Sequence, residues 1–265
     1  MAAISFIGKK MFCDFTVLQY AGFFILGAVV SLINSIAGGG STLSLPLMIF
    51  MGIPPTVANG SNRIGLIVGN FSSAFNLMKH GYLNKKIFLQ LLVPTIVGSL
   101  IGVCVLVHIG DRAFQGILAT AILMIVGMNF LKEDILGKPP TTPPEKLTVK
   151  GAIGFALVAI YGCIVQVGVG LVQIFSLRRY TGLEPIRINA LKNALTNVFL
   201  IVSTTALGFS GKIYWDVAVL MAAGAWLGGY SGSFLQRKKG NKFIKYFTQV
   251  CSVAMAIYLI VDLIK

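Results

Sequence analysis

Two short glycine-rich stretches of the chain have residue types that could bind an anion. Glycines let a chain leave helical geometry, and serine or threonine can cap the helix that follows. The free N–H groups and the positive dipole end of such a helix favour a negatively charged ligand. The alternative is that the glycines only allow close helix packing, as small residues do in membranes. The candidate ligand-binding residues are Asn34, Gly38, Gly39, Gly40, Ser41 and Thr42 in the first stretch, and Gln166, Gly168, Gly170 and Gln173 in the second.

Two polar stripes, one after each of two prolines, form a second group of candidates. Their spacing places the members of each stripe on one face of a helix. By helical rise, Arg63 lies ~13 Å and Lys192 ~10 Å into its helix. A charge at this depth of a ~30 Å core costs at least ~2.5 kcal/mol and is functional by default, unless the side chain snorkels to an interface. The stripe after Pro55 contains Asn59, Asn62, Arg63 and Asn70, and the stripe after Pro185 contains Asn189, Lys192, Asn193 and Asn197.

The acidic residues stand outside the interiors of the apolar segments, so the sequence offers the two cations no buried carboxylate partner. Cations, amide donors and half-helix N-termini together predict a binding site for a small anion. The lack of buried acids argues against a carboxylate proton relay and against a Ca²⁺-type site. We therefore predict no catalytic residue, no metal site and no cofactor.

Membrane-spanning helices have to position these residues. The 265-residue chain is 56% hydrophobic and 11% charged, with a mean hydropathy of +0.84, whereas an ordinary soluble domain has roughly 25% charged residues. Apolar stretches of about 18 residues or more require a bilayer. The net charge of +14 falls in short loops, where it sets orientation in the membrane, so nucleic acid is excluded as a partner. We predict an all-α polytopic membrane protein.

The apolar segments divide into two sets of five around a proline-rich linker, residues 132–150. The first repeat of the transmembrane domain is predicted over residues 1–131 and the second over residues 151–265. In each set a glycine cluster separates a long segment from a short one, whose 11 residues rise only ~16 Å. The predicted segments are Phe15–Ala37, Ser41–Met51, Pro54–Met78, Ile87–His108, Ala113–Leu131, Gly151–Val167, Val169–Arg179, Pro185–Gly208, Trp215–Gln236 and Phe243–Ile264.

A constant shift of 130 positions relates the two halves. Glycine-interrupted short segments at matching positions of two halves indicate a transporter binding site, and we expect the two breaks to meet near its centre. The shift places Gly38, Gly40, Gly52, Pro55, Asn59, Gly81, Gly98 and Gly102 on Gly168, Gly170, Gly182, Pro185, Asn189, Gly211, Gly228 and Gly232.

Corresponding loops of the two halves differ in their positive charge. The loop with Lys79, Lys85 and Lys86 is basic, whereas the corresponding loop has Lys212 as its one cation. Since cytoplasmic loops are enriched in lysine and arginine, corresponding loops should face opposite sides of the membrane. We therefore predict two inverted-topology repeats of about five helical segments each, with a cytoplasmic linker and both termini outside.

The motifs of both halves resemble those of a known transporter family. Ala37-Gly38-Gly39-Gly40-Ser41, Leu45-Pro46-Leu47 and Ala58-Asn59-Gly60-Ser61-Asn62-Arg63 resemble the first repeat of the TauE/SafE sulfite exporter-like family, also called the 4-toluene sulfonate uptake permease family. Gly168-Val169-Gly170 and Asn189-Ala190-Leu191-Lys192-Asn193 are similar to its second repeat. The resemblance implies a multi-pass protein of the plasma membrane that transports sulfur-containing anions such as sulfite, thiosulfate or organosulfonates.

The predicted function is transport of such an anion by alternating access, with the substrate bound between two half-helix N-termini, Arg63 and Lys192. The alternatives are a transporter or channel for small carboxylates or other non-sulfur anions, and an accessory membrane subunit. An enzyme is not expected, because a serine hydrolase would need a histidine near Ser41, whereas His80 and His108 lie at span ends. The predicted partners are a small anionic substrate and the lipid bilayer, and a homo-oligomer stays open.

Overall fold

The computed structural model describes residues 15–130 and 148–264, and the regular structure in these ranges is entirely helical. It confirms the predicted all-α class. The last helix, α9, is two helices separated at Gly240, whose φ is 71°. Residues 132–147 of the predicted linker lie outside the described residues. The helices are α1 (Val17–Ile36), α2 (Ser41–Phe50), α3 (Pro55–Lys79), α4 (Lys85–Leu106), α5 (Asp111–Phe130), α6 (Val149–Ile164), α7 (Val169–Thr181), α8 (Pro185–Phe209) and α9 (Trp215–Ile264).

Caps, prolines and glycines set the helix boundaries close to where the sequence predicts them. The Thr16 side chain caps α1, and Pro55 and Pro185 occupy the first positions of α3 and α8. A proline suits this position because its fixed φ is helical and its missing N–H would have no helical partner. Each short helix follows a glycine with positive φ, 82° at Gly38 and 65° at Gly168. These left-handed glycines divide each long apolar stretch into two helices.

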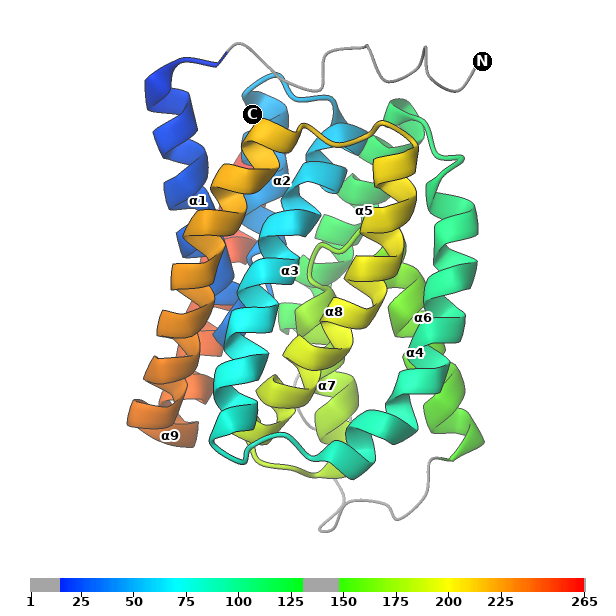
Figure 1. Ribbon diagram of the computed structural model, residues 1–265, viewed down its shortest axis with the longest axis vertical. Helices are drawn as coiled ribbons and strands as arrows, with labels where there is room; N and C mark the ends of the chain where they lie inside the picture. The colour runs from blue at the N-terminus through cyan, green and yellow to red at the C-terminus, as the bar shows by residue number, and fades with distance from the viewer. Residues whose placement is uncertain (1–14, 131–147, 265) are drawn as a thin grey trace.

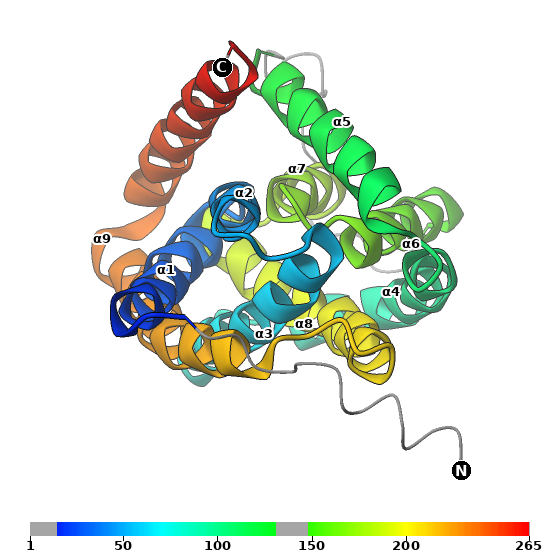
Figure 2. The same ribbon diagram turned by 90° about the horizontal axis from the view of Figure 1, so that it is seen from above.

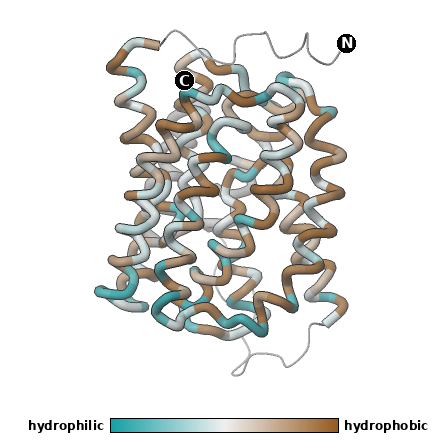
Figure 3. Tube along the Cα trace, viewed as in Figure 1, coloured by the Kyte–Doolittle hydropathy of each residue, from teal (hydrophilic) through white to brown (hydrophobic). Residues whose placement is uncertain are grey.

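Several of the described helices have the length and composition of membrane spans. Val17–Ile36, Lys85–Leu106, Pro185–Phe209 and Trp215–Ile244 are long and apolar enough to cross a bilayer, and Ser41–Phe50 and Val149–Ile164 are apolar but shorter. Figure 3 shows hydrophobic residues along the outer helices and hydrophilic residues gathered at the lower end. These features agree with a multi-pass membrane protein.

The two short helices lie inside the molecule. Figure 1 shows α2 in the upper half and α7 in the lower half. Seen from above, both lie near the middle, with α1, α3, α8 and α6 on one side and α5 and the last part of α9 on the other (Figure 2). The helix α9 packs along α1 and α3, and α4 packs along α6. The other helices therefore enclose the region where α2 and α7 begin.

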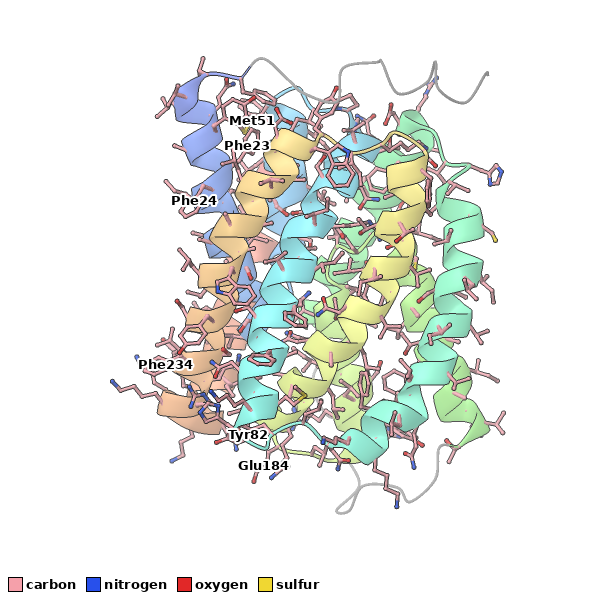
Figure 4. All side chains as sticks on the ribbon, in the orientation of Figure 1. Phe23, Phe24, Met51, Tyr82, Glu184 and Phe234 are labelled. Atoms are coloured by element: carbon pink, nitrogen blue, oxygen red, sulfur yellow. The ribbon has the colours of Figure 1, made fainter. Side chains whose placement is uncertain are left out.

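Corresponding turns of the two halves lie at opposite ends of the molecule. Met51, in the turn between α2 and α3, lies near the upper end, whereas Glu184, between α7 and α8, lies at the lower end, as does Tyr82 (Figure 4). Positions 54 and 184 correspond under the shift of 130. The helix α1 begins and α9 finishes at the upper end, whereas α6 begins at the lower end (Figure 1). Inverted repeats require such an arrangement.

Candidate functional site

The two breaks touch each other through their glycines. A Cβ atom added to Gly38 would lie 2.6 Å from the carbonyl carbon of Gly170, and one added to Gly170 would lie 2.3 Å from the carbonyl oxygen of Gly38. These separations are too short for any side chain, so only glycine fits at both positions. The breaks therefore meet as the repeat predicts, and the N-termini of α2 and α7 lie close together.

Side chains of the second half bind the carbonyl groups at the end of α1. The Lys192 ammonium on α8 donates to the Asn34 carbonyl and, at 3.3 Å, to the Ser35 carbonyl. Asn189 Nδ2 donates to the Ile36 carbonyl at 2.9 Å, and Gln236 Nε2, on α9, donates to the Ser35 carbonyl at 3.1 Å. Three consecutive carbonyls that a broken helix leaves unpaired are thus satisfied from the other half.

Side chains of the first half do the same for α6. Arg63 Nη2, on α3, donates to the carbonyls of Cys163 at 2.5 Å and Ile164 at 3.4 Å, and Asn59 Nδ2 donates to Ile164 at 3.2 Å. The guanidinium also donates to Asn59 Oδ1 at 3.3 Å and, through Nη1, to the Ser203 hydroxyl. The two halves therefore close each other's broken helices in a reciprocal way.

Both cations are removed from solvent, with exposed fractions of 0% for Arg63 and 1% for Lys192. Among the side chains that the structure describes, no aspartate or glutamate is buried. The negative end of a helix dipole carries roughly half an elementary charge. The helix C-terminus beside each cation therefore balances only part of its positive charge. The region between the breaks stays positive.

A small cavity lies where the breaks meet. The space open to water in it is about 20 Å³, which is room for about one water molecule. Its lining residues come from α1, α2, α3, α7 and α8 and from the two breaks. They are Asn34, Gly38, Ser41, Leu66, Asn70, Gln166, Val169, Gly170, Lys192, Thr196, Phe199 and Leu200.

Several polar groups of this cavity have no protein partner. Gln166 is 1% exposed, and both its Oε1 and its Nε2 lack a hydrogen bond. Its φ of 54° is the one positive value of a non-glycine residue in the described chain. Within residues 15–130 and 148–264, no hydrogen bond occupies the backbone N–H of Ser41 or Gly170, each in the first turn of its short helix. Unpaired buried polar groups and a strained backbone both indicate a ligand site.

The cavity brings together seven of the candidates from the sequence, namely Asn34, Gly38, Ser41, Asn70, Gln166, Gly170 and Lys192. The other candidates are not part of its lining. Among them, Gly40 donates its N–H to Asn34 Oδ1 at 2.7 Å, Asn193 Nδ2 donates to the Ser73 hydroxyl at 2.7 Å, and Gln173 Oε1 accepts from Thr196 at 2.6 Å. Outside the lining stand Gly39, Gly40, Thr42, Asn59, Asn62, Arg63, Gly168, Gln173, Asn189, Asn193 and Asn197.

Sequence reasoning missed three polar residues of this region. Thr196 lies four positions after Lys192, so the helical period could have placed it on the same face. Ser203, which accepts from Arg63, lies further along that helix. Gln236 closes a predicted span beside the basic run that follows it, so the sequence indicates an interfacial residue, but the structure buries it completely. Its partners, Asn189 and Ser35, are far away in sequence and give no local signal.

Comparison with known proteins identifies the family. The family model described as "Sulfite exporter TauE/SafE" matches residues 23–259. The chain belongs to the TauE/SafE family. It is 28% identical to a "Probable membrane transporter protein ORF9" of Sinorhizobium sp., covering 90% of this chain and 91% of the relative. It is 24% identical to a "Probable membrane transporter protein" of Haemophilus influenzae, with 90% and 93% covered, and to YfcA of Escherichia coli, another "Probable membrane transporter protein", with 90% and 88% covered. No solved structure matches.

Membership of the TauE/SafE family makes the chain a membrane transporter, and the predictions of its family and of its place in a membrane are confirmed. The names of these relatives specify no substrate.

Proposed function

We propose that this TauE/SafE protein transports a small sulfur-containing anion, such as sulfite, thiosulfate or an organosulfonate, by alternating access. The observation that carries the proposal is Gln166, a buried side chain with both amide atoms unpaired at the cavity between the breaks. A buried amide left without partners costs about 1–3 kcal/mol. An anion whose oxygen accepts a hydrogen bond from Gln166 Nε2 removes the part of this cost that belongs to the donor.

The electrostatics of the cavity support an anion rather than a cation. The N-termini of α2 and α7 each present a backbone N–H without a partner in the described chain, at Ser41 and Gly170. Lys192 adds a full positive charge, and its ammonium has a third proton beyond those donated to Asn34 and Ser35. Charge-assisted hydrogen bonds from such groups suit the oxygens of sulfite or a sulfonate. The choice of sulfur rests on the description of the family.

The small size of the cavity supports a mechanism in which the halves move. Space for about one water molecule does not hold a sulfite ion with its three oxygens, so the two halves must separate for the anion to enter. The opposite placement of the turns at Met51 and Glu184 supports inverted repeats as the moving parts (Figure 4). Rocking of one repeat against the other then opens the site first to one side and then to the other.

Transport by purified protein in sealed vesicles tests the proposal. Sulfite, thiosulfate and a short alkyl sulfonate are compared with small carboxylates, and we expect saturable flux of a sulfur anion. Gln166→Met keeps the side-chain size and removes both amide atoms, so it should lower this flux at least tenfold. Gln115→Met, at an exposed position of α5, is the matched control and should leave the flux unchanged.

Three outcomes would contradict the proposal. Flux of carboxylates alone would assign a different substrate class. Flux that does not saturate and shows no exchange against anion on the opposite side would indicate a channel. Full sulfite transport by Gln166→Met would exclude this cavity as the binding site.

A further inference from the structure

The carbonyl groups at the ends of α1 and α6 have the chemistry of a cation site. In transporters with broken helices, unwound carbonyls and half-helix C-termini commonly bind the co-transported sodium ion, while the N-termini face the anionic group of the substrate. Sodium binds to such oxygens because they carry partial negative charge and lie at the negative end of the helix dipole. In this protein both C-terminal ends are already occupied by positively charged side chains.

The end of α1 is occupied by an ammonium group. Lys192 Nζ contacts the Asn34 and Ser35 carbonyls, and the next carbonyl, of Ile36, accepts from Asn189. An ammonium at this position brings one positive charge to carbonyl oxygens, as a bound alkali cation would. Because Lys192 is 1% exposed, its side chain lies within the site at the end of α1 and does not cover it from the outside.

The end of α6 is occupied in the same way by a guanidinium group. Arg63 contacts the Cys163 and Ile164 carbonyls, and Asn59 contributes a second donor to Ile164. Arg63 and Lys192 come from opposite halves of the chain, on α3 and α8. A buried cation thus occupies the C-terminal end of a broken helix in both halves, although Arg63 and Lys192 do not stand at equivalent positions of the repeat.

We propose that Lys192 and Arg63 are tethered substitutes for a coupling cation, and that the transporter moves its anion without sodium. This inference deepens the proposed function, because it concerns the ion that accompanies the anion. The positive charge that stabilises the broken helices stays with the protein during transport, so no sodium ion is needed to complete the site.

The first test uses the wild-type protein. Its thermal unfolding midpoint is measured in detergent in sodium chloride and in choline chloride at equal ionic strength, and sulfite flux into vesicles is measured with and without a sodium gradient. We expect equal midpoints and equal fluxes in both salts. A midpoint that rises in sodium, or a flux that requires it, would overturn the inference.

The second test empties the place at the end of α1. Lys192→Ala removes the ammonium and leaves the carbonyls of Asn34 and Ser35 open to a small cation. We expect the midpoint of this variant to be higher in sodium than in choline by about 2–4 °C, a response that the wild type lacks. Arg63→Ala tests the end of α6 in the same way. Lys86→Ala, at an exposed position in the first turn of α4, is the control and should show no sodium response.

Each outcome decides the inference independently of the substrate. If no flux of sulfite, thiosulfate or the sulfonate is detected, the proposed function fails, but the unfolding measurements still report whether sodium binds. If a folded Lys192→Ala or Arg63→Ala variant shows no sodium response, the carbonyls do not form a cation-binding site and the inference is wrong. If neither variant folds, the wild-type comparison of sodium with choline decides.

Discussion

Gly38 and Gly170, 132 positions apart in the chain, touch backbone to backbone, and a Cβ atom on Gly170 would lie 2.3 Å from the carbonyl oxygen of Gly38. This contact sets how closely α2 and α7 can place their N-termini. Neither glycine can be replaced without moving one broken helix away from the other. The geometry of the cavity therefore depends on the absence of a side chain at both of these positions.

We predict that Gly170→Ala strongly impairs the protein. The added methyl group collides with backbone atoms that have no rotamer to adopt, and overpacking of this kind costs about 1–3 kcal/mol or more. The thermal unfolding midpoint in detergent and the amount of folded protein in membranes report the loss. Gly154→Ala is the control, because nothing lies within 4 Å of a Cβ atom there and alanine suits a helix better by about 0.5–1 kcal/mol. Equal stability of both variants would show that the two breaks are not in tight steric contact.

Gln166→Gly should separate stability from transport. Glycine adopts a φ of 54° without strain, whereas a glutamine in the left-handed region costs about 1–2 kcal/mol. The substitution also removes an unpaired buried amide, so we expect a higher unfolding midpoint together with a loss of anion flux. Gln166→Asn, which keeps an amide and tolerates the left-handed region, should retain part of the flux. A glycine variant that is more stable and transports normally would show that the strain at Gln166 serves no ligand.

Lys192→Ala should lower substrate affinity as well as stability, because the Asn34 carbonyl also loses its ammonium donor. Lys192 lines the cavity, and a charge-assisted hydrogen bond contributes about 1.5–3 kcal/mol, so the apparent affinity should fall about tenfold to a hundredfold. Concentration-dependent flux in vesicles measures this change. Lys192→Arg keeps the charge and should recover a part of the affinity. Unchanged affinity in a folded Lys192→Ala variant would remove Lys192 from the binding site.

Arg63→Ala should act mainly on stability. Arg63 lies outside the cavity lining, and its removal leaves the carbonyl of Cys163 without its guanidinium donor and weakens the contacts of Ile164. Unpaired buried carbonyls cost about 1–3 kcal/mol each, so the unfolding midpoint should fall clearly. Arg112→Ala, at an exposed position of α5, is the matched control and should change it little. A normal midpoint with weakened substrate affinity would instead place Arg63 at the anion.

The orientation in the membrane can be read from single cysteines at opposite ends of the molecule. We predict that Met51→Cys reacts with a membrane-impermeant thiol reagent on intact cells, whereas Glu184→Cys reacts only after permeabilisation. The prediction follows from the basic residues that flank the turn at Glu184, since such residues stay cytoplasmic. The parent protein without added cysteine serves as the control for labelling of native thiols. The reverse pattern would invert the predicted topology.

The helices were predictable because several boundaries have a local chemical signal. Prolines begin α3 and α8, and positive-φ glycines separate the short helices from the long ones, so the sequence locates them within a few residues. The meeting of the breaks was predictable as well, because the repeat places the break at Gly38–Gly40 and the break at Gly168–Gly170 at equivalent positions of the two halves. The succession of long and short helices along the chain follows from the prolines and glycines together with the repeat.

The partners of the two cations were not predictable from the sequence. Burial depth indicates that Arg63 and Lys192 have a function, but backbone carbonyls leave no signature in side-chain types. The bonds to Cys163 and Asn34 join residues 100 and 158 positions apart, and only the packing of the halves creates them. The left-handed Gln166 was also beyond sequence reasoning about backbone, because glutamine rarely adopts that conformation.

The reciprocal closure of the broken helices also governs how the protein is made. A ribosome synthesises α1 and Arg63 before α6 and Lys192 exist, so the newly inserted first half contains open carbonyls and an uncompensated cation. Each such group in lipid costs several kcal/mol. The first half therefore reaches its final conformation only when the second half arrives, and neither half is a self-sufficient folding unit. A gene cut within residues 132–147 would yield two fragments that accumulate when they are produced together and are degraded when produced alone.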